Sequence, residues 1–150
     1  MPPTLREQLD AVLRDNAFAR LVGVELVDWD AGRAVTSLVA DADRANIHGS
    51  AHGGALFTLA DVAFEVACNS YGRTCVGLDV AVHYAAPARA GERVEARAEE
   101  ASRSRGVASY RVDVSGEDGR TLCVILATAY RTREWHLGED AWPEEWRASH

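Results

Sequence analysis

The hydrophobic positions near the start of the chain recur at the three- and four-residue spacing of an amphipathic helix. These positions are Leu5, Leu9, Val12, Leu13 and Phe18. Thr4 comes just before them and Glu7 follows three residues later, which is the spacing of a capping box at a helix start. The pattern predicts one short helix over residues 4–18.

Six further runs are rich in β-forming residues. The first two, GVELVDWD and RAVTSLVA, flank the segment Asp30–Gly32, which indicates a hairpin. The other four cover residues 75–84, 93–102, 107–115 and 120–133, with turns at 87–91, 104–106 and 116–119. Because turns of hairpin length cannot make the crossovers of parallel strands, we expect an antiparallel sheet.

The segment 55–69 is hydrophobic on nearly every side, as expected for a helix that is buried over most of its surface. Its place between the second and third β-rich runs favours an α+β fold in which a curved antiparallel sheet wraps around a central helix. A chain of 150 residues suits a single domain, 1–150. The tail at 134–150 is acidic and carries three of the four tryptophans without a clear period, so its place on its own chain or on a neighbouring subunit stays open.

Composition narrows the classes of partner. The net charge is −7, with 16 basic against 23 acidic residues, which argues against a nucleic-acid surface. The cysteines Cys68, Cys75 and Cys123 form no CxxC pair and have apolar neighbours, so we interpret them as reduced core residues and expect no disulfide and no zinc. The N-terminus does not resemble a signal peptide, and no apolar stretch reaches the ~20 residues that span a bilayer, so we expect a cytoplasmic protein without a membrane partner.

The polar side chains of the central helix fall on one stripe, at spacings of three, four and four: Thr58, Asp61, Glu65 and Asn69. Such a stripe is either the solvent side of an ordinary helix or the wall of a cleft. Its narrow width, with Leu, Phe, Val and Ala on both sides, favours a cleft.

Two glycines, Gly53 and Gly54, come immediately before this helix. The start of a helix leaves backbone N–H groups without partners at the positive end of the helix dipole, and glycine lets a ligand oxygen approach them. The alternative is that both glycines only supply turn conformations. With a carboxylate aligned nearby, we favour an oxyanion site, since acyl transfer requires donors that face the developing negative charge.

Polar residues of the preceding loop have two interpretations each. His52 either orients the loop and contacts an acyl oxygen or is a structural hydrogen-bonding residue, and Asn46 either caps the loop or holds the glycine turn. The chain has no GxSxG, GxGxxG, GxxxxGK[ST] or HExxH motif, so the common serine-hydrolase, nucleotide and metal motifs do not apply. The remaining candidate mechanism is catalysis by a carboxylate, assisted by the backbone N–H groups at the start of a helix.

The segment NIHGSAHGGALFTLADVAFEVACNS, residues 46–70, closely resembles the signature of hotdog-fold acyl-CoA thioesterases of the phenylacetic-acid-degradation type. The segment LDVAVHYAAPARAGERVEA, residues 78–96, is similar to a second motif of that family. Two departures occur there: Gly91-Glu92 stands where Gly-Asp is usual, and Ala85 stands where a larger or basic residue often precedes the proline.

The resemblance implies a hotdog fold that assembles as a homodimer, commonly as a dimer of dimers, and that hydrolyses acyl-CoA thioesters without a metal or other cofactor. It implies that Asp61 is the catalytic carboxylate and the Gly53 N–H the oxyanion donor. His52, Gly54 and Asn46 would form the supporting loop, and Glu65 falls where related enzymes hold water or substrate. The acyl group would be aromatic, of the phenylacetyl type, or a short to medium aliphatic chain.

Spacing along the helix adds a condition. Gly53 and Asp61 are eight residues apart, about 12 Å along a helix axis, which is too far for both to contact one carbonyl group. We therefore expect each site to combine Asp61 of one subunit with Gly53 of the other. Asp61 would act either as a nucleophile or as a general base towards water.

The phosphates of CoA require cations, and the candidates near strand turns are Arg89, Arg103 and Arg105, each of which is otherwise a solvated surface residue. Two other functions remain open. One is a hotdog hydratase or dehydratase acting on acyl thioesters, which would need an acid and base pair. The other is a non-catalytic acyl-CoA-binding module.

Overall fold

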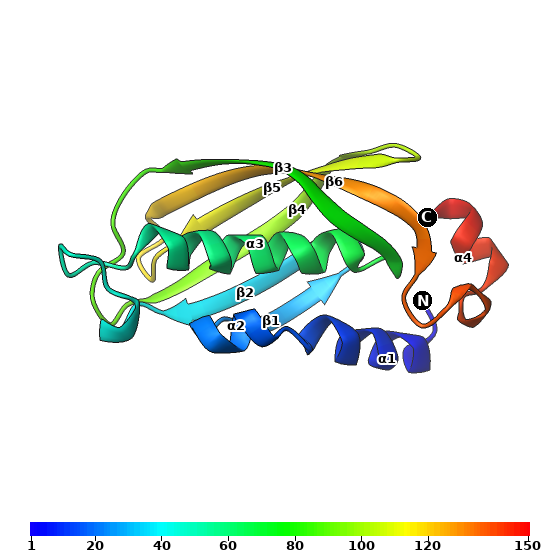
Figure 1. Ribbon diagram of the computed structural model, residues 1–150, viewed down its shortest axis with the longest axis horizontal. Coiled ribbons are helices and arrows are strands. Elements are labelled where there is room, and N and C mark those ends of the chain that lie inside the picture. Colours follow the sequence, from blue (N-terminus) through cyan, green and yellow to red (C-terminus); the bar gives the residue numbers. More distant parts are fainter.

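The computed structural model describes all 150 residues. Six strands form one antiparallel sheet in the order β1-β2-β4-β5-β6-β3. Their bounds are Glu25–Asp30 for β1, Arg33–Val39 for β2, Arg73–Tyr84 for β3, Arg93–Arg103 for β4, Val107–Ser115 for β5 and Thr121–Trp135 for β6. The sheet curves around the helix α3, Gly53–Asn69, which lies along its concave face (Figure 1). This arrangement confirms the predicted α+β fold.

The core lies between the sheet and α3, and 34 buried hydrophobic residues form it as one connected cluster. On β4 and β5 alternate side chains point into this cluster, as the two-residue period of a strand requires. Leu59, Ala63 and Val66 of α3 have at most 1% of their surface exposed. The remaining side of α3 is not covered by the sheet, and this leaves room for a site.

The N-terminal segment differs from its prediction. Instead of one helix over 4–18, the chain forms α1, Pro3–Arg14, and a separate α2, Ala17–Val22. The Asn16 side chain caps α2 by accepting a hydrogen bond from the Ala19 N–H at 2.9 Å. The predicted capping box is absent, because Pro2 occupies the N-cap of α1 and no side chain caps that helix. Phe18 therefore belongs to α2 and not to the first helix.

The C-terminal tail packs on its own chain at the end of the molecule where α3 terminates (Figure 1). After β6 it forms a short 3₁₀ turn, Glu139–Ala141, and the helix α4, Glu144–Ser149. The Trp142 ring is 2% exposed, and the Trp146 indole N–H donates to the Tyr71 carbonyl at 2.9 Å. These contacts decide the question that the tryptophan-rich tail left open. None of the helices is both long enough and apolar enough to cross a membrane.

Candidate active site

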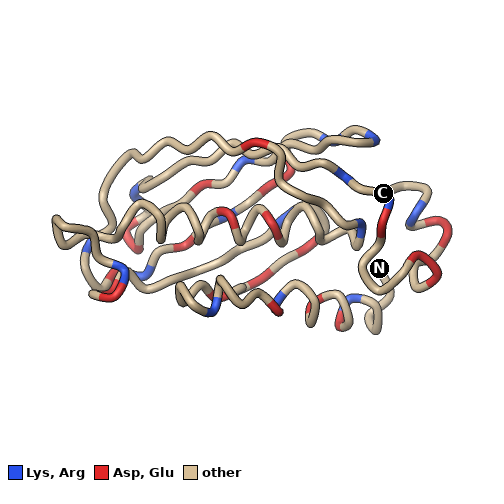
Figure 2. Tube along the Cα trace, viewed as in Figure 1, with Lys and Arg blue, Asp and Glu red and all other residues tan.

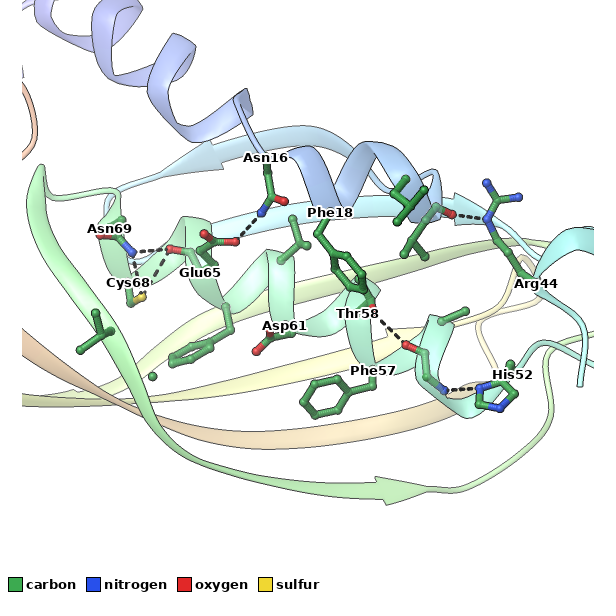
Figure 3. A pocket seen from close by; sticks show the side chains of 18 of the residues that line it. Asn16, Phe18, Arg44, His52, Phe57, Thr58, Asp61, Glu65, Cys68 and Asn69 are labelled. Carbon is green, nitrogen blue, oxygen red and sulfur yellow. Dashed lines mark hydrogen bonds between the residues drawn. The ribbon is translucent and has the colours of Figure 1, made fainter.

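An open cleft of about 1040 Å³ runs along the uncovered side of α3. Phe18 of α2 and Phe57 of α3 contribute apolar surface to it (Figure 3), and Val76 of β3 also lines it. All four polar residues of the predicted stripe line this cleft: Thr58, Asp61, Glu65 and Asn69. The prediction of a cleft wall is therefore confirmed.

Two of these four residues are held by structural hydrogen bonds. The Thr58 hydroxyl donates to the Gly54 carbonyl of its own helix at 2.8 Å. The Asn69 side-chain oxygen accepts the Cys75 N–H at 2.8 Å and also contacts the His136 ring at 2.8 Å. Asn69 thus ties the end of α3 to β3 and to the tail, which leaves the two carboxylates as the candidates for chemistry in the stripe.

Asp61 is half-buried in the middle of the cleft and forms no hydrogen bond or ion pair within the chain. Burial raises the pKa of this carboxyl above its usual value, because water that would stabilise the charged form is displaced. An unpaired, partly desolvated carboxylate is destabilising for a fold, and such groups concentrate at active sites.

Glu65 lies one turn beyond Asp61 at the mouth of the cleft. Its Oε2 atom accepts a hydrogen bond from the Asn16 side-chain amide at 2.6 Å. Although the side chain is exposed at its edge, the surrounding protein displaces enough water to raise the pKa of Glu65, and the charge of Asp61 raises it further. The sequence alone did not identify Asn16 as part of the site. The one local indication was that it is an asparagine, a residue that is common at helix N-caps.

At the start of α3 a single backbone donor is free. The Gly54 N–H donates to the Nδ1 atom of the His52 ring at 2.8 Å, so His52 caps the helix. The Ala55 and Leu56 N–H groups both donate to the His52 carbonyl, at 2.9 and 3.3 Å. The Gly53 N–H has no partner within the chain. The structure therefore shows the structural hydrogen bond that one of the two interpretations gave to His52, and its contact with an acyl oxygen stays a prediction.

Two further residues fix the loop around this donor. The Tyr84 hydroxyl of β3 donates to the Gly53 carbonyl at 2.9 Å, a contact that the sequence did not predict. Asn46 accepts the His48 N–H at 2.8 Å and donates to the Ser50 hydroxyl at 2.9 Å, so it holds the turn before the glycines. The free N–H therefore sits in a rigid setting, as an oxyanion site requires.

The predicted cationic residues separate into two places. Arg103 and Arg105 lie in a second hollow, of about 570 Å³, at the end of the molecule that holds the C-terminus, where basic positions gather (Figure 2). We call this hollow the arginine pocket, and its cations are Arg73, Arg103, Arg105, Arg131 and Arg147. Arg89 does not join it, because it pairs with Asp118 at 3.2 Å in another hollow.

The buried member of the arginine pocket is Arg131, which is 6% exposed. It donates to the main-chain oxygens of Ser104, at 2.5 Å, and of His150, the last residue of the given sequence. Burial lowers the pKa of Arg131, and the charges of Arg73 and Arg103 lower it further. Arg103 pairs with Glu100 at 3.3 Å and Arg147 pairs with Glu139, whereas Arg73 and Arg105 have no carboxylate partner and are the arginines of the pocket that can contact an anion.

Comparison with known proteins agrees with this geometry. Residues 48–123 match the family model of the thioesterase superfamily, more than half of the chain. The chain belongs to the thioesterase superfamily. It is 30% identical to the acyl-coenzyme A thioesterase PaaI of Escherichia coli K12 over 129 residues, which is 86% of this chain and 92% of that protein.

Solved structures place the chain in the PaaI-like hotdog group. The E. coli PaaI structure superposes with a TM-score of 0.82 at 28% identity, covering 87% of this chain and 94% of that one. A mutant of PaaI from Thermus thermophilus is 39% identical, with a TM-score of 0.75 over 78% of this chain and all of that one. A thioesterase protein from Streptococcus pneumoniae, solved with coenzyme A, is 26% identical, with a TM-score of 0.69 over 73% of this chain and 85% of that one. The chain is thus an acyl-CoA thioesterase with a hotdog fold.

Proposed function

We propose that this enzyme hydrolyses acyl-CoA thioesters with Asp61 as the reacting carboxylate and the Gly53 N–H as the oxyanion donor. One observation carries the proposal: a single helix presents one free N–H at its start and one unpartnered, half-buried carboxylate farther along. The N–H would stabilise the developing oxyanion, and one such donor contributes on the order of 3 kcal/mol. Asp61 would attack the carbonyl carbon or take a proton from an attacking water.

A second copy of the chain would complete the site. Within α3, Gly53 and Asp61 are about 12 Å apart along the axis, so one chain cannot present both to one carbonyl. The strand β3 is at the edge of the sheet and carries exposed apolar residues, with Leu78 at 59% and Val76 at 50% exposure. An unpaired apolar edge favours pairing with another strand. In the proposed homodimer, two antiparallel α3 helices would bring each Gly53 level with the other chain's Asp61. A further assembly into a dimer of dimers stays a prediction.

The arginine pocket is the proposed site for the CoA phosphates. Arg103 and Arg105 keep their role in this proposal, although Arg103 pairs with Glu100 at 3.3 Å, and Arg73 joins them because it lacks a carboxylate partner in the chain. Arg73 of the pocket and Cys75 of the cleft are two residues apart on β3. Arg89 pairs with Asp118 in another hollow, and its role in binding CoA stays a prediction. The coenzyme A held by the pneumococcal relative supports the ligand class.

The acyl group would occupy the apolar part of the cleft. Phe18, Phe57 and Val62 line it, so a phenylacetyl-type ring or a short to medium aliphatic chain would bury against apolar surface there. CoA is part of the substrate in this proposal, and the residues of the chain supply all the chemistry.

The test is a panel of acyl-CoA substrates assayed for free thiol release, with Asp61→Asn as the variant. The substitution keeps the side-chain shape but removes its charge, so kcat should fall by at least about a hundredfold while substrate still binds. Asp28→Asn is the matched control, because Asp28 is exposed on β1, away from the cleft. Binding of every substrate without turnover would favour the non-catalytic module, and water addition to an enoyl-CoA would favour the hydratase.

A further inference from the structure

Asp61 and Glu65 form a pair of like charges one helical turn apart on the same wall of the cleft (Figure 3). Side chains at this spacing are neighbours on a helix, and two negative charges there destabilise it. Neither carboxylate forms an ion pair with Arg or His in the chain. The one arginine of the cleft, Arg44, bonds instead to Asp41 and to the Val22 carbonyl.

No group around the pair supplies a compensating charge. Asp15, at the end of α1, is paired with Arg20 at 3.1 Å. The His136 ring is held by Asn69, and burial lowers its pKa, which favours the neutral ring. The other titratable groups that line the cleft with Glu65 and Asp61 are Asp43, His52, Cys68 and Cys75, and His52 is held as the cap of α3. Two adjacent carboxylates without a cation share protons, because removing the second proton must overcome the charge left by the first.

The proton of the pair belongs on Glu65. Glu65 is exposed enough to exchange its proton, and the neighbouring charge of Asp61 adds to burial in raising its pKa, while the hydrogen bond from Asn16 opposes part of that rise. Its Oε2 atom accepts from Asn16, which fixes the carboxyl orientation, and its Oε1 atom has no partner in the chain. If the Glu65 carboxyl is protonated while Asn16 holds Oε2, Oε1 carries the proton and can donate it to a group in the cleft.

Glu65 also lies on the side of Asp61 from which the thiol would leave. Along α3 the order is Gly53, Asp61, Glu65 and then the helix end, beyond which lies the arginine pocket. If CoA runs from the carbonyl at Asp61 to phosphates in that pocket, as proposed above, its sulfur and pantetheine arm pass Glu65. We propose that Glu65 is a second catalytic carboxylate, which donates its proton to the departing CoA thiolate, and that Asn16 positions it.

The proposed step balances in protons and electrons. Asp61 takes one proton from water as the water oxygen bonds to the acyl carbon, and the carbonyl π electrons move to the oxyanion. The carbon–sulfur bond then breaks, its electron pair goes to sulfur, and the Glu65 proton moves to that sulfur. The products are the free acid and CoA thiol, and the proton on Asp61 passes to Glu65 to restore the pair. If Asp61 instead attacks directly, the proton transfer from Glu65 to sulfur is the same.

This inference rests on the proposed function, and its test is Glu65→Gln with two leaving groups. Glutamine keeps an oxygen that accepts from Asn16 but cannot donate an acidic proton. We expect kcat/KM for the CoA thioester to fall about a hundredfold, the lower range for general acid catalysis. For the same acyl group on an aryl thiol, whose thiolate leaves without protonation, the change should be less than about threefold.

Two further measurements separate a chemical role from a structural one. In the wild type, activity should fall at alkaline pH as Glu65 loses its proton, and Glu65→Gln should abolish that alkaline limb. Glu65→Asp should restore part of the leaving-group difference, and Asn16→Ala should give a smaller loss with the same dependence on leaving group. Equal losses for both thioesters, or an unchanged alkaline limb, would overturn the inference. A wild type that releases no thiol from any acyl-CoA would instead reject the proposed function itself.

Discussion

Replacing Gly53 with proline would delete the proposed oxyanion donor without removing the helix that carries it. Gly53 is the first residue of α3, where proline is well tolerated because the N–H has no partner within a helix. His52 has φ −62° and ψ 138°, the extended conformation that a residue before proline prefers. The Gly53 N–H bonds to nothing in the chain, so Gly53→Pro breaks no internal hydrogen bond.

The expected loss follows from the geometry. Removing one oxyanion donor lowers kcat by about a hundredfold to a thousandfold, equal to about 3–4 kcal/mol of transition-state stabilisation. The substitution also adds a Cβ atom, which would lie 3.2 Å from Cζ of Tyr84, so that ring must shift by a few tenths of an ångström. Gly53→Ala adds the same atom and keeps the N–H, which makes it the matched control.

Both variants are measured by thiol release from an acyl-CoA and by thermal unfolding. We expect the proline variant to unfold near the alanine variant's temperature but to turn over at least about a hundredfold more slowly. If the proline variant is as active as the alanine variant, the Gly53 N–H does not stabilise the oxyanion, and the proposed mechanism is wrong. In that case a shared loss relative to wild type would be explained by the Tyr84 contact.

The remaining predictions concern Asp61 and the shared site. When inactive Asp61→Asn and Gly53→Pro subunits exchange, activity should return to about a quarter of wild type, because half of the dimers are mixed and half of their sites are intact. If mass measurements confirm the exchange but no activity returns, both groups must act within one chain. Single-turnover hydrolysis in heavy-oxygen water should label the first acid product if Asp61 is a base, whereas an unlabelled oxygen traced to Asp61 would show an anhydride. Burial raises the pKa of the Asp61 carboxyl in the folded chain above its value near 3.8 in the unfolded chain. The contribution of Asp61 to folding stability is therefore fully present below pH 3.8 and is lost as the pH rises through the pKa of the folded state. Thermal unfolding at neutral pH should therefore show Asp61→Asn to be more stable than wild type, and a less stable variant would contradict this account of the site.

Much of the fold could be predicted from the sequence because strands, turns and helices depend on neighbours a few positions away. The period of the β-rich runs placed β5 at its observed bounds, Val107–Ser115, and the hairpin at Asp30–Gly32 joins β1 to β2. The apolar run from residue 55 predicted α3 as a buried helix, and its polar stripe predicted a cleft wall. The motif around Gly53 and Asp61 supplied the family.

What the sequence could not reveal are contacts between residues that are far apart in the chain. The break between α1 and α2 is stabilised where Asn16 both caps α2 and bonds to Glu65, 49 positions later. Tyr84 reaches the Gly53 carbonyl across 31 positions. Local periodicity predicts neither bond, because the distances depend on how α2 and β3 pack beside α3.

The same reason explains the cations. Arg89 and Arg103 are equally plausible in sequence, since both lie at or near strand turns. Both pair with a carboxylate, Arg103 with Glu100 and Arg89 with Asp118, but of the two only Arg103 lies beside Arg73 and Arg131 in the arginine pocket. Charge at a position is a property of the residue, but the electrostatic potential there depends on which other residues the fold brings close, and that was decided by the tertiary structure alone.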